Sequence, residues 1–287
     1  MPELPEVEIV KRSLFKKINK VSIVDIKVKN KNLRYKIPRN FATDLIGQKI
    51  LRISRRSKYL IFYFKKKLLL VHLGMSGKFI LTRTRDRKMF KTSFYYDLNI
   101  IQKHNHIYFK LGNGFTLIYN DVRRFGFFKI YNINELSKIA FLKKLGIEPL
   151  SIKFNNQYFK KFVMHRSKNI KNLLMDQTFV SGLGNIYVNE ALFMTGINPL
   201  RLCNDIEKGE IKRLVLNIKK ILKSSILKGG SSIKDFKNLT GKSGSFQSFF
   251  YVYGRENKNC SRNSCTGKIK KIFISNRSSF YCVKCQN

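Results

Sequence analysis

The sequence has little negative charge and no tryptophan. Asp and Glu total 17 among 287 residues, whereas Lys and Arg total 58, which gives a formal net charge of +41. No apolar run approaches the roughly 18 residues that a membrane-spanning helix needs. The first residues, MPELPEVE, carry acidic groups where a secretory signal carries basic ones. These absences argue against a membrane or exported protein, and we expect a soluble, intracellular one.

The residues that are abundant predict a folded protein that binds a polyanion. Hydrophobic residues make up 43% of the chain and aromatic residues 13%, which excludes disorder for most of it, and the length suits two domains. The positive charge attracts polyanions, with nucleic acid as the first candidate and an anionic membrane as the second. An A/T-rich genome also produces a bias toward Lys, Asn, Ile and Phe, so charge alone identifies no function.

The first half of the chain has one helical pattern followed by strand patterns. Helical spacing of apolar residues from Val7 to Ile18, with Pro5 in the first turn, predicts a helix that begins just after residues 2 and 3. The strand-like runs predict a sandwich or flattened barrel. The expected strands are 21–27, 50–54, 59–64, 68–72, 106–111, 115–119 and 127–130, with a hairpin turn at 112–114 and a long basic loop at 82–103.

The second half of the chain is predicted to be mainly helical. Residues 169–176 and 185–195 read as two helices that flank the turn SGLG, and 207–228 reads as a longer helix stopped by Gly229 and Gly230. Residues 231–246 are rich in Ser, Gly and Lys and read as a loop. Asn185 is expected at the N-cap of the second helix, where a capping amide and free N–H groups suit an anion.

Four cysteines near the end of the chain have the spacing of a metal site. Cys260, Cys265, Cys282 and Cys285 follow the pattern C-x4-C-x16-C-x2-C. Four thiolates suit a closed tetrahedral structural zinc site, and the segment is too short to fold well around a core of its own. A pair of disulfides is the alternative, which an intracellular location disfavours. The fifth, Cys203, reads as an ordinary half-buried thiol.

The N-terminus carries a candidate nucleophile. Pro2 becomes the terminal residue when Met1 is removed, which a small second residue permits. An α-amino group titrates near ~8, so far more of it is neutral at pH 7 than of a lysine. A neutral amine can attack a sugar C1′ and form a Schiff base, and Glu3 could move protons to and from the sugar. A plain helix start explains the same residues.

Two glycine-flanked segments and the cysteine hairpin carry candidate DNA contacts. In HLGMSG at 72–77 and DVRRFG at 121–126, exposed Met75 and Phe125 would enter a base stack, and Arg123 would occupy the space left by a flipped base. Core packing is the alternative for both apolar residues. Arg277 lies near the turn of the hairpin, where it suits a phosphate, although a solvated basic surface also explains it.

Six motifs together resemble the formamidopyrimidine-DNA glycosylase family, bacterial enzymes that excise oxidised purines. They follow one another in the family's order and span the chain. They are MPELPEVE at 1–8, HLGMSG at 72–77, DVRRFG at 121–126, IKNLLMDQTFVSGLGNIYVNEALF at 170–193, FQSFFYVYGRE at 246–256 and FYCVKCQ at 280–286.

The resemblance implies an α+β fold with three parts. An N-terminal catalytic β-sandwich is expected at 1–134, a helical domain with a helix–two-turn–helix motif at 135–250, and a four-cysteine zinc-finger hairpin at 251–287, with DNA in the cleft between them. It also implies roles for single residues: Pro2 as nucleophile, Glu3 as acid/base and Lys58 as the catalytic group beside the lesion phosphate. The implied DNA contacts are His72, Met75, His104, Arg123, Phe125, Asn185, Lys234 and Arg277, the last also as proton donor for δ-elimination.

The implied activity is that of a bifunctional DNA glycosylase and abasic-site lyase of base-excision repair. Its substrate would be double-stranded DNA with an oxidised purine or an abasic site, and its cofactor one structural Zn²⁺. We expect a monomer in the bacterial cytoplasm, associated with the nucleoid and not with membrane.

The sequence departs from the family pattern at three places, and two rival functions are compatible with parts of it. The first cysteine pair is spaced x4 where x2 is usual, 82–103 is longer and more basic than usual, and Val122 stands where Pro is common. An endonuclease VIII-like enzyme for oxidised pyrimidines would usually begin MPEGPE and lack RRFG. A non-catalytic DNA- or RNA-binding zinc protein is the other rival, and Pro2, Glu3 and Lys58 argue against it.

Overall fold

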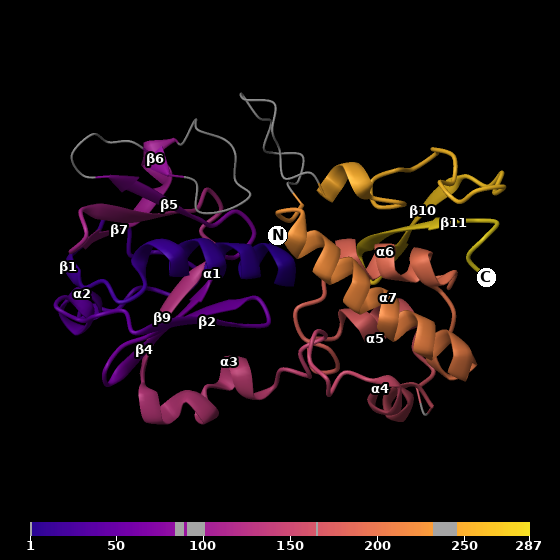
Figure 1. Ribbon diagram of the computed structural model, residues 1–287, viewed down its shortest axis with the longest axis horizontal. Helices are drawn as coiled ribbons and strands as arrows, with labels where there is room; N and C mark the ends of the chain where they lie inside the picture. Colours follow the sequence, from indigo (N-terminus) through magenta and orange to yellow (C-terminus); the bar gives the residue numbers. More distant parts are fainter. Residues whose placement is uncertain (1, 84–88, 91–100, 165, 232–245) are drawn as a thin grey trace. The chain divides into compact units, whose positions relative to one another are not determined.

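Two separate stretches of the chain build each of two structural units (Figure 1). The computed structural model describes residues 2–83, 89–90, 101–164, 166–231 and 246–287. The first unit comprises the described residues of Met1–Lys143 and Lys228–Ser245, and the second those of Lys144–Leu227 and Phe246–Asn287. The division into three domains expected from the sequence is finer than this one and stays a prediction.

Two antiparallel sheets form the body of the first unit. One has the strand order β1-β7-β8-β5-β6 and the other β2-β3-β4-β9. Their strands are β1 (Ile23–Val28), β2 (Arg52–Arg56), β3 (Tyr59–Tyr63), β4 (Lys67–His72), β5 (Lys78–Arg83), β6 (Met89–Phe90), β7 (Asn105–Leu111), β8 (Phe115–Asn120) and β9 (Phe127–Asn132). Helices α1 (Leu4–Ile18), α2 (Phe41–Leu45) and α3 (Ala140–Lys143) and the 3₁₀ turns η1 (Gln102–His104) and η2 (Ile133–Lys138) complete it.

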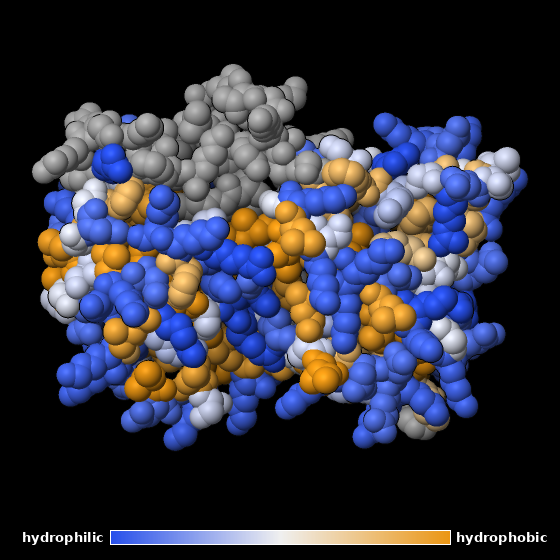
Figure 2. All heavy atoms as spheres, in the orientation of Figure 1, coloured by the Kyte–Doolittle hydropathy of each residue, from blue (hydrophilic) through white to orange (hydrophobic). Residues whose placement is uncertain are grey.

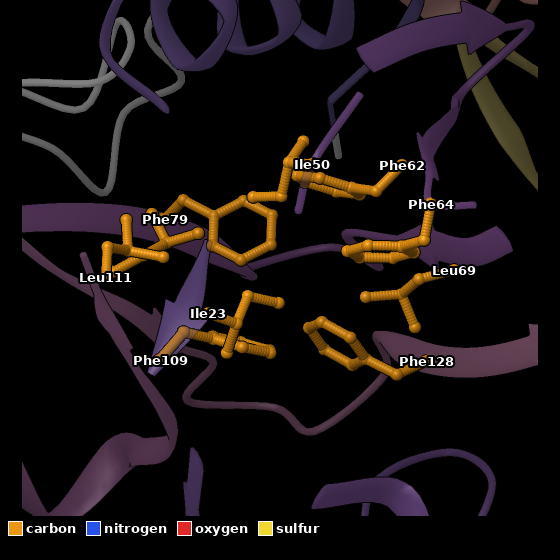
Figure 3. A pocket seen from close by; sticks show the side chains of 10 residues that line it. Ile23, Ile50, Phe62, Phe64, Leu69, Phe79, Phe109, Leu111 and Phe128 are labelled. Atoms are coloured by element: carbon orange, nitrogen blue, oxygen red, sulfur yellow. The ribbon is translucent and has the colours of Figure 1, made fainter. Parts of the chain in front are cut away.

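Side chains from both sheets meet in one apolar core. Phe62 and Leu69 come from the four-stranded sheet, whereas Phe79, Phe109 and others come from the five-stranded sheet, and Figure 3 shows their side chains around a shared centre. The space left between them is about 10 Å³ and has no polar lining. The buried face of α1 (Val7, Val10, Leu14 and Ile18) packs into the same core, which fixes the N-terminal helix to the sandwich.

The predicted sandwich and its seven strands are confirmed, and two further strands appear. Strand β5 was not predicted; it pairs with β8 from Lys78↔Asn120 to Arg83↔Phe115. The expectation of a loop over all of 82–103 is therefore wrong at its start, where Thr82 and Arg83 end β5 and Met89–Phe90 form β6. Residues 84–88 and 91–100 lie outside the described part of the chain. The hairpin turn at 112–114 is confirmed between β7 and β8.

The second unit consists of helices and a C-terminal hairpin. Its elements are α4 (Asn156–Val163), α5 (Ile170–Met175), α6 (Asn185–Thr195), α7 (Lys208–Leu227), the 3₁₀ turns η3 (Cys203–Asp205) and η4 (Phe246–Phe249), and strands β10 (Ile269–Ile274) and β11 (Arg277–Cys282). The helices share one apolar core, and the hairpin packs on α6 through Phe193 and Phe280. The predicted helices at 169–176, 185–195 and 207–228 are confirmed to within one residue at each end.

Candidate functional site

The N-terminus of α1 is buried and held by two glutamates. Pro2 is buried, and Glu3, which is 4% exposed, is the N-cap residue of α1. Glu3 and Glu6 form a capping box, in which the Glu3 N–H donates to Glu6 Oε2 at 2.9 Å. The other carboxylate oxygen, Glu6 Oε1, accepts from the N–H (3.0 Å) and the hydroxyl (2.9 Å) of Ser231. The proposed nucleophile and acid/base are thus adjacent residues at a fixed helix start.

Lys58 lies in the tight turn between β2 and β3. Arg56 pairs with Tyr59, so Ser57 and Lys58 form a two-residue turn, and Ser57 has a φ of +54°. Lys58 is only 7% exposed. Arg55 braces this turn, because its Nη1 donates to Ser57 O at 2.9 Å and its Nε to Glu8 Oε2 at 3.0 Å. A contact from α1 therefore sets the position of the turn that carries the lysine.

Glu8 is held as a carboxylate by three cations. Its oxygens accept from Lys11 (2.8 Å), Arg12 (2.8 Å) and Arg55 (3.0 Å). Burial raises the pKa of Glu8, but hydrogen bonds from these cations outweigh burial and lower the pKa below its ordinary value. Glu8 therefore stays charged at neutral pH and keeps Arg55 in place.

His72 ends β4 and is neutral at physiological pH. Burial is the main reason that its pKa falls to about 4, with smaller contributions from the positive charges of Lys58 and Arg34. Its Nδ1 accepts from the N–H of Gly74 at 3.1 Å, so in the neutral ring Nε2 carries the proton. The imidazole stacks on Phe127 at 5.6 Å. His72 can therefore donate one hydrogen bond to a phosphate without a charge of its own.

The two glycine-flanked segments expose the side chains predicted to enter the base stack. Met75 and Phe125 are each 42% exposed, so core packing does not explain them. Arg123 is exposed, and its guanidinium lies 4.6 Å from the centre of the Phe125 ring. Gly74 cannot be replaced without a backbone clash, since a Cβ there would lie 2.4 Å from Gly126 N. The segments 72–77 and 121–126 are therefore in direct contact.

The buried carboxylate of Asp121 connects these two segments through hydrogen bonds. It is fully buried, and its carboxylate accepts from the hydroxyls of Ser76 and Tyr119 and from the N–H groups of Gly126 (2.9 Å) and Arg123 (3.3 Å). One oxygen pairs with Ser76 and Arg123 and the other with Tyr119 and Gly126. Sequence reasoning missed Asp121, although a lone acid inside DVRRFG of a very basic chain was a usable signal.

In the second unit, two polar side chains, Lys171 and Asn185, hold the strand that begins with Arg277. Lys171 Nζ donates to Ser278 O (3.0 Å) and Ser279 Oγ (2.6 Å), and Asn185 Nδ2 donates to Ser278 O (2.9 Å). Lys171 is 1% exposed, and burial and the charge of Arg277 lower its pKa to about 8. The structure thus brings Asn185 and Arg277, predicted from separate motifs, to one place.

The predicted capping role of Asn185 is wrong. Gly184 is the N-cap residue of α6, and Asn185 is its first helical residue. The Asn185 amide bonds to β11 instead, and Asn189 one turn later contacts the same strand: its Oδ1 accepts from Phe280 N at 2.7 Å. Sequence spacing reveals the helix start but not a strand more than 90 residues away.

The four cysteines converge as metal ligands would. Their sulfur atoms all lie within 4.8 Å of one another, with Cys260 and Cys285 at 3.7 Å and Cys265 and Cys282 also at 3.7 Å. Disulfide bonds need about 2.05 Å, whereas a tetrahedral ion with bonds of about 2.3 Å places its sulfurs about 3.8 Å apart. The disulfide alternative is therefore excluded, and the C-x4-C spacing is compatible with a closed site that could hold a metal ion.

The longer cysteine loop has a structural use. Arg262, inside C-x4-C, donates to Phe193 O at the C-terminal end of α6, and its guanidinium lies 5.0 Å from the centre of the Phe193 ring. The extra residues therefore bulge toward α6 and do not strain the sulfur cluster.

Of the remaining predicted contacts, His104 adjoins the segment 121–126, because its carbonyl accepts from the N–H of Asp121 at 3.0 Å. His104 ends the short turn η1, and burial and the charge of Lys103 lower its pKa. Lys234 lies outside the described residues. Hydrophilic side chains cover much of the face shown in Figure 2.

Two protein-family models match the chain, one in each half. The model of the formamidopyrimidine-DNA glycosylase N-terminal domain matches residues 1–128, and the model of the H2TH domain of the same enzymes matches residues 145–237. The chain belongs to the formamidopyrimidine-DNA glycosylase family. It is therefore a DNA glycosylase of base-excision repair, and its fold is the one that this family shares.

Individual relatives agree over their full lengths. The formamidopyrimidine-DNA glycosylase of Bartonella tribocorum is 39% identical over 297 residues and that of Rickettsia bellii 41% over 288, with 99–100% of each chain covered. Among solved structures, a Lactococcus lactis Fpg mutant in complex with DNA containing Fapy-dG has a TM-score of 0.86 at 35% identity, with 100% of both chains covered. The Lactococcus lactis Fpg with abasic-site DNA has a TM-score of 0.86 at 34% identity and covers 99% of each chain.

No helix in the described ranges is both long and apolar enough to cross a membrane.

Proposed function

We propose that this glycosylase excises oxidised purines, 8-oxoguanine and formamidopyrimidines, from duplex DNA and then cleaves the strand at the abasic site. The observation that carries the proposal is the full-length similarity to an enzyme solved with Fapy-dG DNA, together with Pro2 and Glu3 at the buried start of α1. Its partner would be double-stranded DNA with an oxidised purine or an abasic site. It would act as a monomer, in the bacterial cytoplasm at the nucleoid.

The chemistry proposed for Pro2 begins once Met1 is removed. The secondary amine attacks C1′, the bond between C1′ and the base breaks, and the base leaves with the electron pair and takes up a proton. The nitrogen then loses its proton, its lone pair expels O4′ as the sugar ring opens, and O4′ takes up a proton, which leaves an iminium at C1′. The iminium withdraws electrons from C2′ and acidifies the C2′ proton. Loss of that proton expels the 3′ phosphate, and a second elimination expels the 5′ phosphate. Glu3 would transfer protons at the sugar, and Lys58 would hold the lesion phosphate.

DNA binding would precede this chemistry. Met75, Phe125 and Arg123 would open the base stack and fill the space of the flipped base. Their exposure, on segments joined by Asp121, supports this role. His72, His104, Asn185 and Arg277 would contact the backbone, Arg277 also donating a proton in the δ-elimination, and Lys234 would belong to the loop over the flipped base.

The metal proposed for the four cysteines is one structural Zn²⁺. Cys260, Cys265, Cys282 and Cys285 would hold it as thiolates. Burial alone would raise the pKa of Cys282, but backbone N–H groups of Lys284 and Cys285 outweigh it and lower that pKa to about 7, which favours a thiolate ligand. Bound zinc would fix the hairpin that carries Arg277 and take no part in the reaction.

Borohydride trapping tests the proposal. Wild-type protein and duplex DNA with 8-oxoguanine opposite cytosine should give a covalent adduct when borohydride reduces the iminium, and Pro2→Gly should give none. Binding without an adduct would refute the proposed enzymatic activity and would indicate a protein that only binds DNA. The Lactococcus lactis Fpg has also been solved with DNA containing an oxidised pyrimidine. Preferential trapping on thymine glycol would therefore refute the purine assignment.

A further inference from the structure

An open pocket of about 590 Å³ lies in the first unit beside the segment 121–126. Three arginines line it, and none of the described residues that line it is acidic. Concentrated positive charge at a concave surface attracts an anion. The pocket is lined by Asn32, Leu33, Arg34, Arg123, Arg124 and Phe125.

Arg34 projects from a loop that is fixed at both ends. Leu33 and Ile37 on either side of it are buried, at 8% and 2% exposure. The N–H of Ile37 donates to Lys31 O at 2.9 Å, which closes the loop, and the N–H of Arg34 donates to Gly126 O at 3.2 Å. The backbone of Arg34 is therefore tied to the end of the DVRRFG segment, while its side chain is exposed.

Arg124 has a left-handed backbone conformation, which favours glycine or asparagine over arginine. Its φ is +56°, in the left-handed region that glycine and asparagine adopt with less strain. Strain of this kind concentrates at functional positions. The nearest acid in the sequence, Asp121, is buried beneath the loop and accepts four other hydrogen bonds. The turn thus presents an exposed cation whose neighbouring acid is already engaged.

Arg34 interacts electrostatically with His72, for which a backbone contact is proposed above. The charge of Arg34 contributes to the lowered pKa of His72. Neutral His72 offers one N–H, whereas a guanidinium offers a pair of donors that matches two phosphate oxygens.

We propose that Arg34 and Arg124 bind a backbone phosphate of the damaged duplex in this pocket. The inference rests on the proposed function, since it adds a contact to the same DNA. Arg123 and Phe125, on the same segment, have the task of entering the base stack. Arg34 and Arg124 contact the backbone beside it and hold the segment in register.

Binding should be measured on a duplex with a tetrahydrofuran abasic-site analogue, which the enzyme cannot cleave by elimination. The double variant Arg34→Gln/Arg124→Gln should bind about ten-fold more weakly. The slope of log K against log salt should fall by about 0.9, the value for one lost phosphate contact. Arg39→Gln removes another exposed arginine of the same unit that does not line the pocket, and it should leave both quantities near wild type.

A methylphosphonate scan locates the phosphate. Neutral methylphosphonates are placed one at a time on either strand, and the affinity of each duplex is measured with wild type and the double variant. At one position the loss of about ten-fold in wild type should disappear in the variant, because the two changes remove the same contact. That position identifies the phosphate, and therefore the strand, that Arg34 and Arg124 contact.

Equal losses in both proteins at every position would overturn the inference. The proposed function is judged separately, by borohydride trapping with wild type. An adduct without phosphate coupling therefore refutes the pocket alone, whereas the absence of an adduct refutes the reaction.

Discussion

Replacing Asp121 by Asn should destabilise the protein and impair the opening of the base stack. The side chain keeps its shape, but one carboxylate oxygen becomes an NH₂ group. Either orientation puts this donor against two others: Ser76 and Arg123, or Tyr119 and Gly126. At least one buried donor then loses its acceptor, at about 1–3 kcal/mol, and the remaining bonds are no longer charge-assisted.

The expected loss in free energy of unfolding is about 2–4 kcal/mol, or roughly 5–15 °C in Tm. Urea titration followed by circular dichroism measures it. The control is Asp25→Asn, which removes an exposed carboxylate paired with Lys110 at 3.1 Å and should cost under about 0.5 kcal/mol.

Activity should separate two substrates. The proposed function gives Met75 and Phe125 the role of opening the base stack, so the single-turnover rate of 8-oxoguanine excision should fall about ten-fold or more in Asp121→Asn. Cleavage at an existing abasic site, where no base must be displaced, should fall less. A variant that unfolds at the same urea concentration as wild type and excises 8-oxoguanine at the same rate would refute the role of Asp121.

Three further predictions concern a titration, the metal and the lysine turn. The pKa of His72 is near 6.5 in the unfolded chain but about 4 in the folded protein, so the free energy of unfolding should fall as the pH drops below 6.5, by about 2 kcal/mol at pH 5. Urea titrations at pH 5 and 7.5 measure this pH dependence, which His72→Gln should reduce by that amount; an unchanged pH dependence contradicts the assignment. Metal analysis should find one zinc per chain, and chelation should weaken DNA binding; a content well below one in folded protein would count against the four-cysteine site. Arg55→Met removes the hydrogen bonds to Glu8 and Ser57, so Schiff-base formation should slow about ten-fold while affinity for the abasic analogue changes little. Arg55→Lys, which keeps the charge beside Glu8, should recover part of the rate, and equal rates in all three proteins would exclude a positioning role for Arg55.

Local patterns in the sequence were sufficient for most elements. The apolar spacing and Pro5 predict α1, and the predicted bounds of α6 match the observed Asn185–Thr195. Strand β5 was not predicted, because its short run, Lys78–Arg83, directly follows a glycine-containing turn and continues into a basic stretch without a clear boundary. Its pairing with β8 is a long-range contact, which sequence periodicity does not report.

The residues around the site were harder to foresee for the same reason. Pro2 and Glu3 lie in the motif MPELPEVE, the role of Lys58 was implied by the family resemblance, and the roles of all three stay predictions. Glu8 and Arg55, 47 residues apart, and Asp121 and Ser76, 45 residues apart, act through contacts that have no spacing signal. Asn185 shows the limit clearly: a correctly predicted helix start led to a wrong cap, because a distant strand takes its amide.

The bond between Glu6 and Ser231 has a consequence for synthesis on the ribosome. The two residues are 225 positions apart, yet both belong to the first unit. The N-terminal helix leaves the ribosome early, but the carboxylate at its start gains this partner only after most of the chain has been translated. A nascent chain would therefore carry its proposed nucleophile for most of its translation in an unfinished setting. The start of α1 therefore gains this contact only after the segment Lys144–Leu227 of the second unit has been translated.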